Sequence, residues 1–415
     1  MDIYQVIKKD KQIIKFSYYG FFKDLKFFEP YLLIYLISLG YDLFEIGLFF
    51  AIRAGVTYIF EIPSAMIADF YGKKNELLIC FVFYIISFLL FLWGSSSVII
   101  GLGMIFFGLG EAFRSGTHKA MILSYLEQKG WYEHKGFVYG RTRSYSLLGS
   151  SLSAFLSVIF VLQIPALKWV FAISVIPYII DFILIATYPN SLNERFVQEN
   201  SLHSFWKTSI MQLKSIMHNR QILKIVFSGS SYDGVFKTIK DYIQPILSVI
   251  ILSAGVGTIA SLDQDQSLKV YLGLLYGLFY IVSSYASKNV FRATTKFGQV
   301  KVFETMYDLM GILLIVLAIS VGNEFLYITM IVYFILYFMS DARRPTFLEV
   351  SSDHMDKSQR VTVLSIESQI RAFFMMIFAP LFGFIAETFS LSILFVIIGI
   401  MLLIANRFLS LKSKI

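Results

Sequence analysis

Twelve apolar segments separated by polar breaks constrain the fold of this chain more than any other feature. A helix needs about 20 apolar residues to cross the hydrocarbon core of a bilayer. The segments are 13–39, 44–69, 76–94, 97–126, 137–162, 165–188, 222–252, 269–288, 302–321, 324–350, 360–386 and 390–410. Most breaks are only a few residues long, and the longest is 189–221. The sequence therefore predicts an all-α membrane protein with twelve transmembrane helices.

The composition supports this prediction and excludes several classes of protein. Hydrophobic residues make up 57% of the chain and charged residues 15%, against about a quarter in soluble proteins. The net charge of +8 does not indicate a nucleic-acid partner, because the basic residues lie in short loops between apolar segments. The single cysteine, Cys80, excludes an intrachain disulfide and a cysteine-based zinc site. We expect no cofactor and no metal.

The distribution of basic residues predicts the orientation in the membrane. Residues 1–12 are polar and basic, and the apolar segment that follows is too long for a cleavable signal peptide. Lysines gather in alternate loops, as at Lys73 and Lys74, whereas the opposite side holds only Lys168 and Lys269. Basic loops face the cytoplasm. We therefore expect a multi-pass protein of the inner (cytoplasmic) membrane with both termini cytoplasmic.

The long central break divides the chain into two six-helix halves. We expect an N-terminal half at 1–188, a linker at 189–221 and a C-terminal half at 222–415. The stretch 202–224 alternates apolar and basic residues, which indicates either an amphipathic helix on the inner membrane surface or a solvated linker helix. Membrane lipids are expected partners in either case.

Two internal repeats relate the halves. The matching stretches are GFFKDLK at 20–26 with GVFKTIK at 234–240, each followed by a proline (Pro30 and Pro245), and EAFR at 111–114 with DARR at 341–344. The first pair lies in segments 1 and 7, and the second in segments 4 and 10. Both pairs are six segments apart, as two duplicated halves require.

Charged residues inside these segments are the candidate functional residues. A charge near the bilayer centre costs a few kcal/mol and normally faces a partner or a water-filled cavity. The candidate substrate-binding residues are Lys23, Lys26, Glu29, Glu111, Arg114, Lys237, Lys240, Asp341 and Arg344. The lysines of the repeats share helix faces and would face one another across a pseudo-twofold axis, which suits an anion. Alternatively, charges at helical spacing form structural ion pairs, as in Glu111–Arg114, Asp341–Arg344, Glu367–Arg371 and Asp233–Lys237–Asp241.

The break after the second segment, with the sequence EIPSAMIADFYGKK at 61–74, resembles the loop between helices 2 and 3 of major facilitator superfamily transporters. The usual pattern there is G-x-x-x-D-x-x-G-[RK]-[RK], and Ala65 replaces its first glycine. The stretch 108–117 also looks like helix 4 of many bacterial members. The resemblance implies two pseudo-symmetric six-helix bundles, a monomer, and a central cavity lined by helices 1, 4, 7 and 10. It also implies a cytoplasmic gate, whose residues are Glu61, Asp69, Gly72, Lys73, Arg141 and Arg360. In that gate Asp69 would contact the start of helix 11 near Arg360.

The working hypothesis is an alternating-access secondary transporter of a small polar solute, either anionic or zwitterionic. Protons are an expected coupling ion, with Glu29, Glu111 and Asp341 as candidate carriers. An efflux pump for amphipathic compounds or lipids is the alternative, which aromatic residues such as Phe21 favour. The signatures of drug/proton antiporters are not matched, since Met104 replaces their helix-4 arginine. An intramembrane enzyme is a third class, but His118 has no second metal ligand at a suitable spacing.

Overall fold

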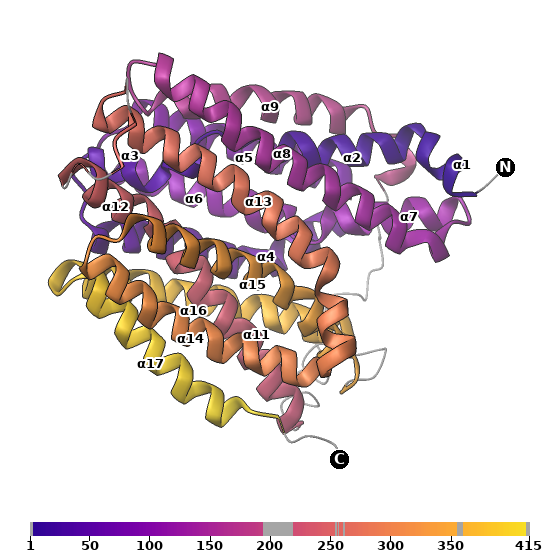
Figure 1. The fold of residues 1–415 in the computed structure, drawn as a ribbon. Coiled ribbons are helices and arrows are strands. Elements are labelled where there is room, and N and C mark those ends of the chain that lie inside the picture. Colours follow the sequence, from indigo (N-terminus) through magenta and orange to yellow (C-terminus); the bar gives the residue numbers. More distant parts are fainter. Residues whose placement is uncertain are drawn as a thin grey trace. The chain divides into compact units, whose positions relative to one another are not determined.

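The computed structural model of this chain is built from helices and describes residues 3–193, 219–253, 255, 257–259, 262–354 and 360–411. The helices before the central linker are α1 (Ile3–Lys9), α2 (Lys11–Lys23), α3 (Leu32–Ser38), α4 (Leu43–Tyr71), α5 (Lys73–Trp93), α6 (Ser97–Arg114), α7 (Thr117–Gln128), α8 (Lys135–Gln163) and α9 (Trp169–Ala186) (Figure 1). Those after it are α11 (Arg220–Ile239), α12 (Ile243–Ser248), α13 (Gln264–Phe297), α14 (Gln299–Gly322), α15 (Leu326–Ser352), α16 (Arg360–Thr388) and α17 (Leu391–Leu409). Most of the linker and of the predicted amphipathic stretch 202–224 lies outside the described residues.

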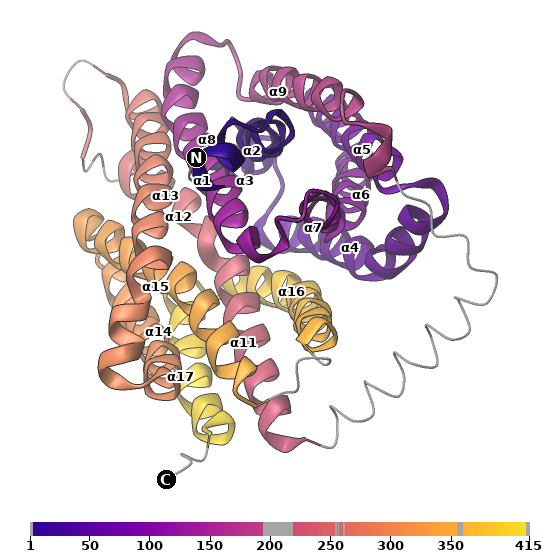
Figure 2. The ribbon, with the colours of Figure 1, turned by 90° about the vertical axis from the view of Figure 1, so that its right-hand side faces the viewer.

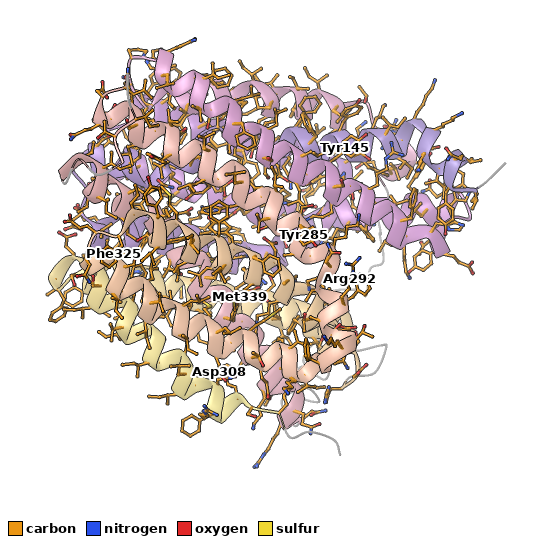
Figure 3. The ribbon with its side chains drawn as sticks, viewed as in Figure 1. Tyr145, Tyr285, Arg292, Asp308, Phe325 and Met339 are labelled. Carbon is orange, nitrogen blue, oxygen red and sulfur yellow. The ribbon has the colours of Figure 1, made fainter. Side chains whose placement is uncertain are left out.

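Ten spans in the described part of the chain are long and apolar enough to cross a membrane. They run through α4, α5, α6 with α7, α8, α9 and α13 to α17. Large apolar side chains stay exposed along them, such as Leu148 at 59% and Ile331 at 56%. In Figure 3 the labelled rings of Tyr285 and Phe325 also lie at the surface. Such a surface suits contact with lipid, and the chain is an all-helical, multi-pass membrane protein.

The two predicted segments that are absent from these ten are each broken. Where 13–39 was expected as one helix, α2 ends at Lys23, and a short 3₁₀ turn, η1 (Glu29–Tyr31), leads into α3. The second predicted helix, 222–252, is interrupted in the same way. Helix α11 ends at Ile239 and is followed by η4 (Lys240–Tyr242), α12 and the π-turn η5 (Val249–Ser253). A proline has no N–H and clashes with the carbonyl four residues earlier. Lys26 and Asp241, the residues four positions before Pro30 and Pro245, both lie within the breaks.

These breaks correct one prediction. Lys23 and Lys26 were expected on one face of a continuous helix. Because α2 ends at Lys23, with Asp24 as its C-cap, helical spacing does not relate the two lysines.

The helices form two compact units. Unit 1 comprises residues 1–35, 52–197 and 269–281, and unit 2 comprises 36–51, 198–268 and 282–415. In unit 1, α5 packs against α6 and α9, and α2 packs against α8 and α9, as Figure 2 shows. In unit 2, α14 packs against α15 and α17, and α11 packs against α15 and α16. Residues 43–51 of α4 belong to unit 2 and the rest of α4 to unit 1, whereas residues 269–281 of α13 belong to unit 1 and the rest of α13 to unit 2.

Glycines allow backbones to approach closely within each unit. In unit 1 a Cβ added to Gly149 of α8 would lie 2.3 Å from the carbonyl oxygen of Phe21 in α2. In unit 2 a Cβ on Gly383 of α16 would lie 2.2 Å from the carbonyl oxygen of Leu43 in α4. Small residues at such crossings are typical of membrane helices, whose association depends on van der Waals contact between backbones.

A buried arginine holds three helices of unit 2 together. Arg343 of α15 is 1% exposed, and its guanidinium lies 3.8 Å from the ring centre of Phe303 and 4.4 Å from that of Tyr232. The guanidinium donates hydrogen bonds to the backbone oxygen of Phe303 on α14 and, at 2.8 Å, to the hydroxyl of Ser228 on α11. A planar guanidinium can stack on rings and donate in its plane at the same time.

We therefore predict that Arg343→Lys lowers the melting temperature of the purified protein. A lysine keeps the charge but cannot stack on Phe303 or reach both acceptors, which should cost about 2–4 kcal/mol of unfolding free energy. The matched control is Arg292→Lys on the exposed face of α13, labelled in Figure 3. Equal melting temperatures for the two variants would show that the cage of rings around Arg343 contributes little.

Candidate functional site

The break after α2 carries Asp24 and three of the predicted site residues of unit 1. Lys23 pairs with Asp24 at 3.0 Å, and both side chains are mostly buried. Lys26 is half-buried, and its side chain has no hydrogen bond or ion pair among the described residues, although its charge acts on Asp24 and Glu111. Glu29 begins η1 and acts electrostatically on Arg53 of α4. The break therefore places a mixed cluster of charges inside the helix bundle of unit 1.

Glu111 pairs with an arginine that the sequence analysis did not single out. Arg53 donates from Nε and Nη2 to the two carboxylate oxygens of Glu111, at 2.8 and 2.7 Å. Its guanidinium also lies 4.3 Å from the ring centre of Phe107. Gly108 makes the close crossing possible, because a Cβ there would lie 2.7 Å from the carbonyl oxygen of Arg53. The predicted pairing of Glu111 with Arg114 was therefore wrong.

The signal for Arg53 was present in the sequence. It is the only arginine or lysine in the predicted segment 44–69, and the cost of burying a charge applies to it as to the other candidates.

Arg114 is left without a carboxylate partner in the part of the chain that the structure describes. It is the last residue of α6, and its Nε donates to the hydroxyl of Tyr84 at 3.2 Å. The next residue, Ser115, donates to Glu61 at 2.7 Å. Arg114 thus keeps most of its donors for another group.

In unit 2 four charged residues form a chain across α11, α16 and α15. Glu367 is 0% exposed and accepts from Arg344 at 2.6 Å and from Arg371. Arg371 in turn lies 3.8 Å from Asp233. The predicted Glu367–Arg371 pair is confirmed. Arg344, which was expected to pair with Asp341 on its own helix, binds Glu367 on α16 instead.

The break after α11 also carries charges. Lys237 lies in the last turn of α11 and acts electrostatically on Asp233. Lys240, the C-cap, pairs with Asp241 at 3.0 Å. The hydroxyl of Tyr333 donates to the free carbonyl of Ile239 at 3.2 Å, which satisfies one backbone acceptor of the interrupted helix.

The predicted gate residues are described only in part. Gly72 has φ +94° and is the N-cap of α5, which begins with Lys73, and a Cβ on Gly72 would overlap the side chain of Asn193. Arg141 donates to the carbonyl oxygen of Lys8 at 2.8 Å. The side chains of Asp69 and Arg360 lie outside the described residues, so their contact stays a prediction.

Comparisons with known proteins agree on one family. The model of the Major Facilitator Superfamily matches residues 24–291. The chain is 25% identical over 391 residues to YxaM of Bacillus subtilis (strain 168), an uncharacterised MFS-type transporter, covering 94% of this chain and 92% of that protein.

Solved structures share the fold. A mutant form of the nucleoside transporter NupG superposes with a TM-score of 0.79 at 12% identity, covering 96% of this chain and 98% of the other. A POT family transporter in complex with 5-aminolevulinic acid superposes with a TM-score of 0.68 at 13% identity, covering 95% and 92%. All of these proteins are transporters, not enzymes.

Proposed function

Because the chain belongs to the Major Facilitator Superfamily, we propose that this membrane transporter is a secondary transporter that works by alternating access. Its solute is small and polar, and either anionic or zwitterionic. The proposal includes twelve transmembrane helices in two pseudo-symmetric halves, 1–188 and 222–415, joined by the linker 189–221. We also propose that the protein is a monomer in the inner membrane and that both of its termini lie in the cytoplasm. The likeness to nucleoside and POT transporters concerns the fold alone, so the class of solute rests on this chain's own side chains.

The observation that carries the proposal is the pair of interrupted helices. Both α2 and α11 end at the lysine repeats, and both breaks hold charged side chains. In transporters, discontinuous helices near the bilayer midplane commonly form the solute site, because side chains and free backbone groups become available there. The repeats lie in corresponding segments of the two predicted halves. Lys23, Lys26, Glu29, Lys237 and Lys240 are therefore retained as proposed solute-binding residues.

The pairing pattern in unit 1 favours a solute with a negative group. Asp24 and Glu111 each have a basic partner, whereas Lys26 and Arg114 have no carboxylate partner among the described residues. A carboxylate or phosphate from the solute would supply the missing anion, with Arg114 able to bind in a bidentate manner. Glu111 in unit 1 and, in unit 2, Asp341 and Arg344 are also proposed solute-binding residues. Because these residues carry both signs of charge, the solute is either an anion or a zwitterion.

Lys26 provides the test. We predict that small organic anions or amino acids raise the melting temperature of the wild-type protein and that Lys26→Ala abolishes this shift. A ligand at 100 times its dissociation constant stabilises the folded state by about 2.7 kcal/mol. The panel would contain organic anions, phosphorylated compounds, amino acids, sugars and lipophilic cations, followed by flux of any hit into proteoliposomes. Lys237→Ala would test the second repeat in the same assay.

The control is Lys9→Ala, which removes an exposed lysine of α1 and should leave the ligand shift intact. Stabilisation by lipophilic cations that persists in Lys26→Ala would contradict the anion proposal and favour efflux of amphipathic compounds. If Lys9→Ala loses the ligand-induced shift of the melting temperature as fully as Lys26→Ala does, the shift depends on the overall charge of the protein and not on the break after α2.

A further inference from the structure

Asp181 is a buried carboxyl group that the proposed solute site does not use. It lies within α9, its side chain is 0% exposed, and neither carboxyl oxygen has a hydrogen-bond partner among the described residues. Burying an ionised carboxylate without such partners is strongly unfavourable. An intramembrane acid in this position requires a function or a compensating group.

The titratable groups around Asp181 come from the end of α2, from α5 and from the residues just after α9. Helix α9 packs against α2, α5 and α8. From α2, the charges of Lys23 and Asp24 act on Asp181, and Asp181 acts on Tyr19. From α5, Cys80 interacts with it, as does Tyr188 just beyond α9. The buried face of α8 carries no titratable side chain.

Among these groups Lys23 is the cation, and it is held by Asp24 at 3.0 Å at the end of α2. Two carboxyl groups therefore compete for one ammonium group. Asp24 has the contact in this structure, and Asp181 has none. The charge on Asp181 decides how strongly it attracts Lys23.

We propose that Asp181 is a proton-binding site of unit 1, and that loss of its proton draws the Lys23 ammonium away from Asp24 and so rearranges the break in α2. The proton comes from water and returns to water. In the protonated state the Lys23–Asp24 pair is intact. In the ionised state Lys23 lies between two carboxylates, and the end of α2 changes its position.

This assignment differs from the carriers expected from the sequence. A proton on Glu111 would disrupt two charge-assisted hydrogen bonds to Arg53. A proton on Asp181 breaks none, because the carboxyl oxygens have no partner in the described part of the chain. The inference rests on the proposed transport function only for its link to solute movement, since proton binding can be measured without any solute.

Infrared spectroscopy of the purified protein tests the site directly. The carbonyl stretching band of carboxylic acids would be followed as pH is raised, in the wild type, in Asp181→Asn and in the control Glu111→Gln. We expect one titrating component of this band to be absent from Asp181→Asn and present in the control. An identical titrating band in Asp181→Asn would overturn the proposal.

Two further variants test the link to Lys23. Asp181→Glu should restore a titrating component with a different midpoint. Lys23→Gln should move the wild-type midpoint by about one pH unit or more, since it removes the neighbouring cation. If Asp181→Asn does not give monodisperse protein, the comparison of Lys23→Gln with the wild type decides alone. An unchanged midpoint of the titrating carboxyl band in Lys23→Gln would refute the coupling between Asp181 and Lys23. If Lys26→Ala keeps the ligand-induced shift of the melting temperature, the solute-site proposal fails but the infrared spectra are unaffected. The two proposals can therefore fail separately.

Discussion

Replacing Glu367 with glutamine is expected to lower the melting temperature of the purified protein strongly. Glu367 is fully buried and binds both Arg344 and Arg371. Glutamine keeps the size of the side chain but not its charge. Arg344 then loses its carboxylate, and Arg371 retains the longer contact to Asp233 and its hydrogen bond to Ser368. Removing one member of a buried ion pair typically costs about 3–5 kcal/mol, and we expect the lower end of this range because the side chain of Arg344 is 42% exposed. Thermal unfolding in detergent measures the effect.

Two variants make this prediction specific. Glu349→Gln is the same substitution at an exposed position of α15 and should leave the melting temperature nearly unchanged. The double variant Glu367→Gln/Arg344→Gln should recover part of the loss, because it also removes one unneutralised cation. If Glu367→Gln and Glu349→Gln have the same melting temperature, the chain of charges across α11, α16 and α15 does not stabilise unit 2.

A methyl group added at Gly149 is expected to weaken unit 1, whereas the same group at Gly140 should not. Both residues lie inside α8. At Gly149 a Cβ would lie 2.3 Å from the carbonyl oxygen of Phe21, and at Gly140 it would meet no atom within 4 Å. Forcing α2 away from α8 should cost about 1–3 kcal/mol. Alanine at an open helical site is neutral or up to about 1 kcal/mol stabilising.

The measurement compares melting temperatures of Gly149→Ala and Gly140→Ala with that of the wild type. A lower melting temperature for Gly149→Ala and a higher one for Gly140→Ala would confirm that backbone contact sets the distance between α2 and α8. Because Gly149 lies against the last turns of α2, its variant should also reduce the ligand-induced shift that depends on Lys26. Equal behaviour of the two variants would show that α2 moves aside at no measurable cost.

The sequence predicts the helical membrane class and the family well, and the reasons are physical. A hydrocarbon core about 30 Å thick demands long apolar helices, and short breaks mark their ends. The order of helices before and after the linker follows the predicted segments closely. The repeats at Lys23 and Lys237 also pointed to the places where the structure carries charged breaks.

The partner of each charge could not be predicted in the same way. Spacing along one helix suggested Glu111 with Arg114 and Asp341 with Arg344, yet Arg53 and Glu367 on neighbouring helices take these roles. Which residues face each other across two helices depends on rotation and depth, and these are set by close crossings such as that at Gly108. Pro30 and Pro245 follow the two lysine repeats, and a proline disfavours regular helix in the turn before it, which the spacing of the lysines alone does not show.

The course of α4 and α13 through both units bears on how this protein is assembled. Residues 36–51 precede the central linker but are packed with unit 2, and residues 269–281 follow it but are packed with unit 1. Neither product of a cut in the linker would therefore contain a complete compact unit. Each fragment would hold a piece that the other needs, so synthesis of the second half completes the folding of the first.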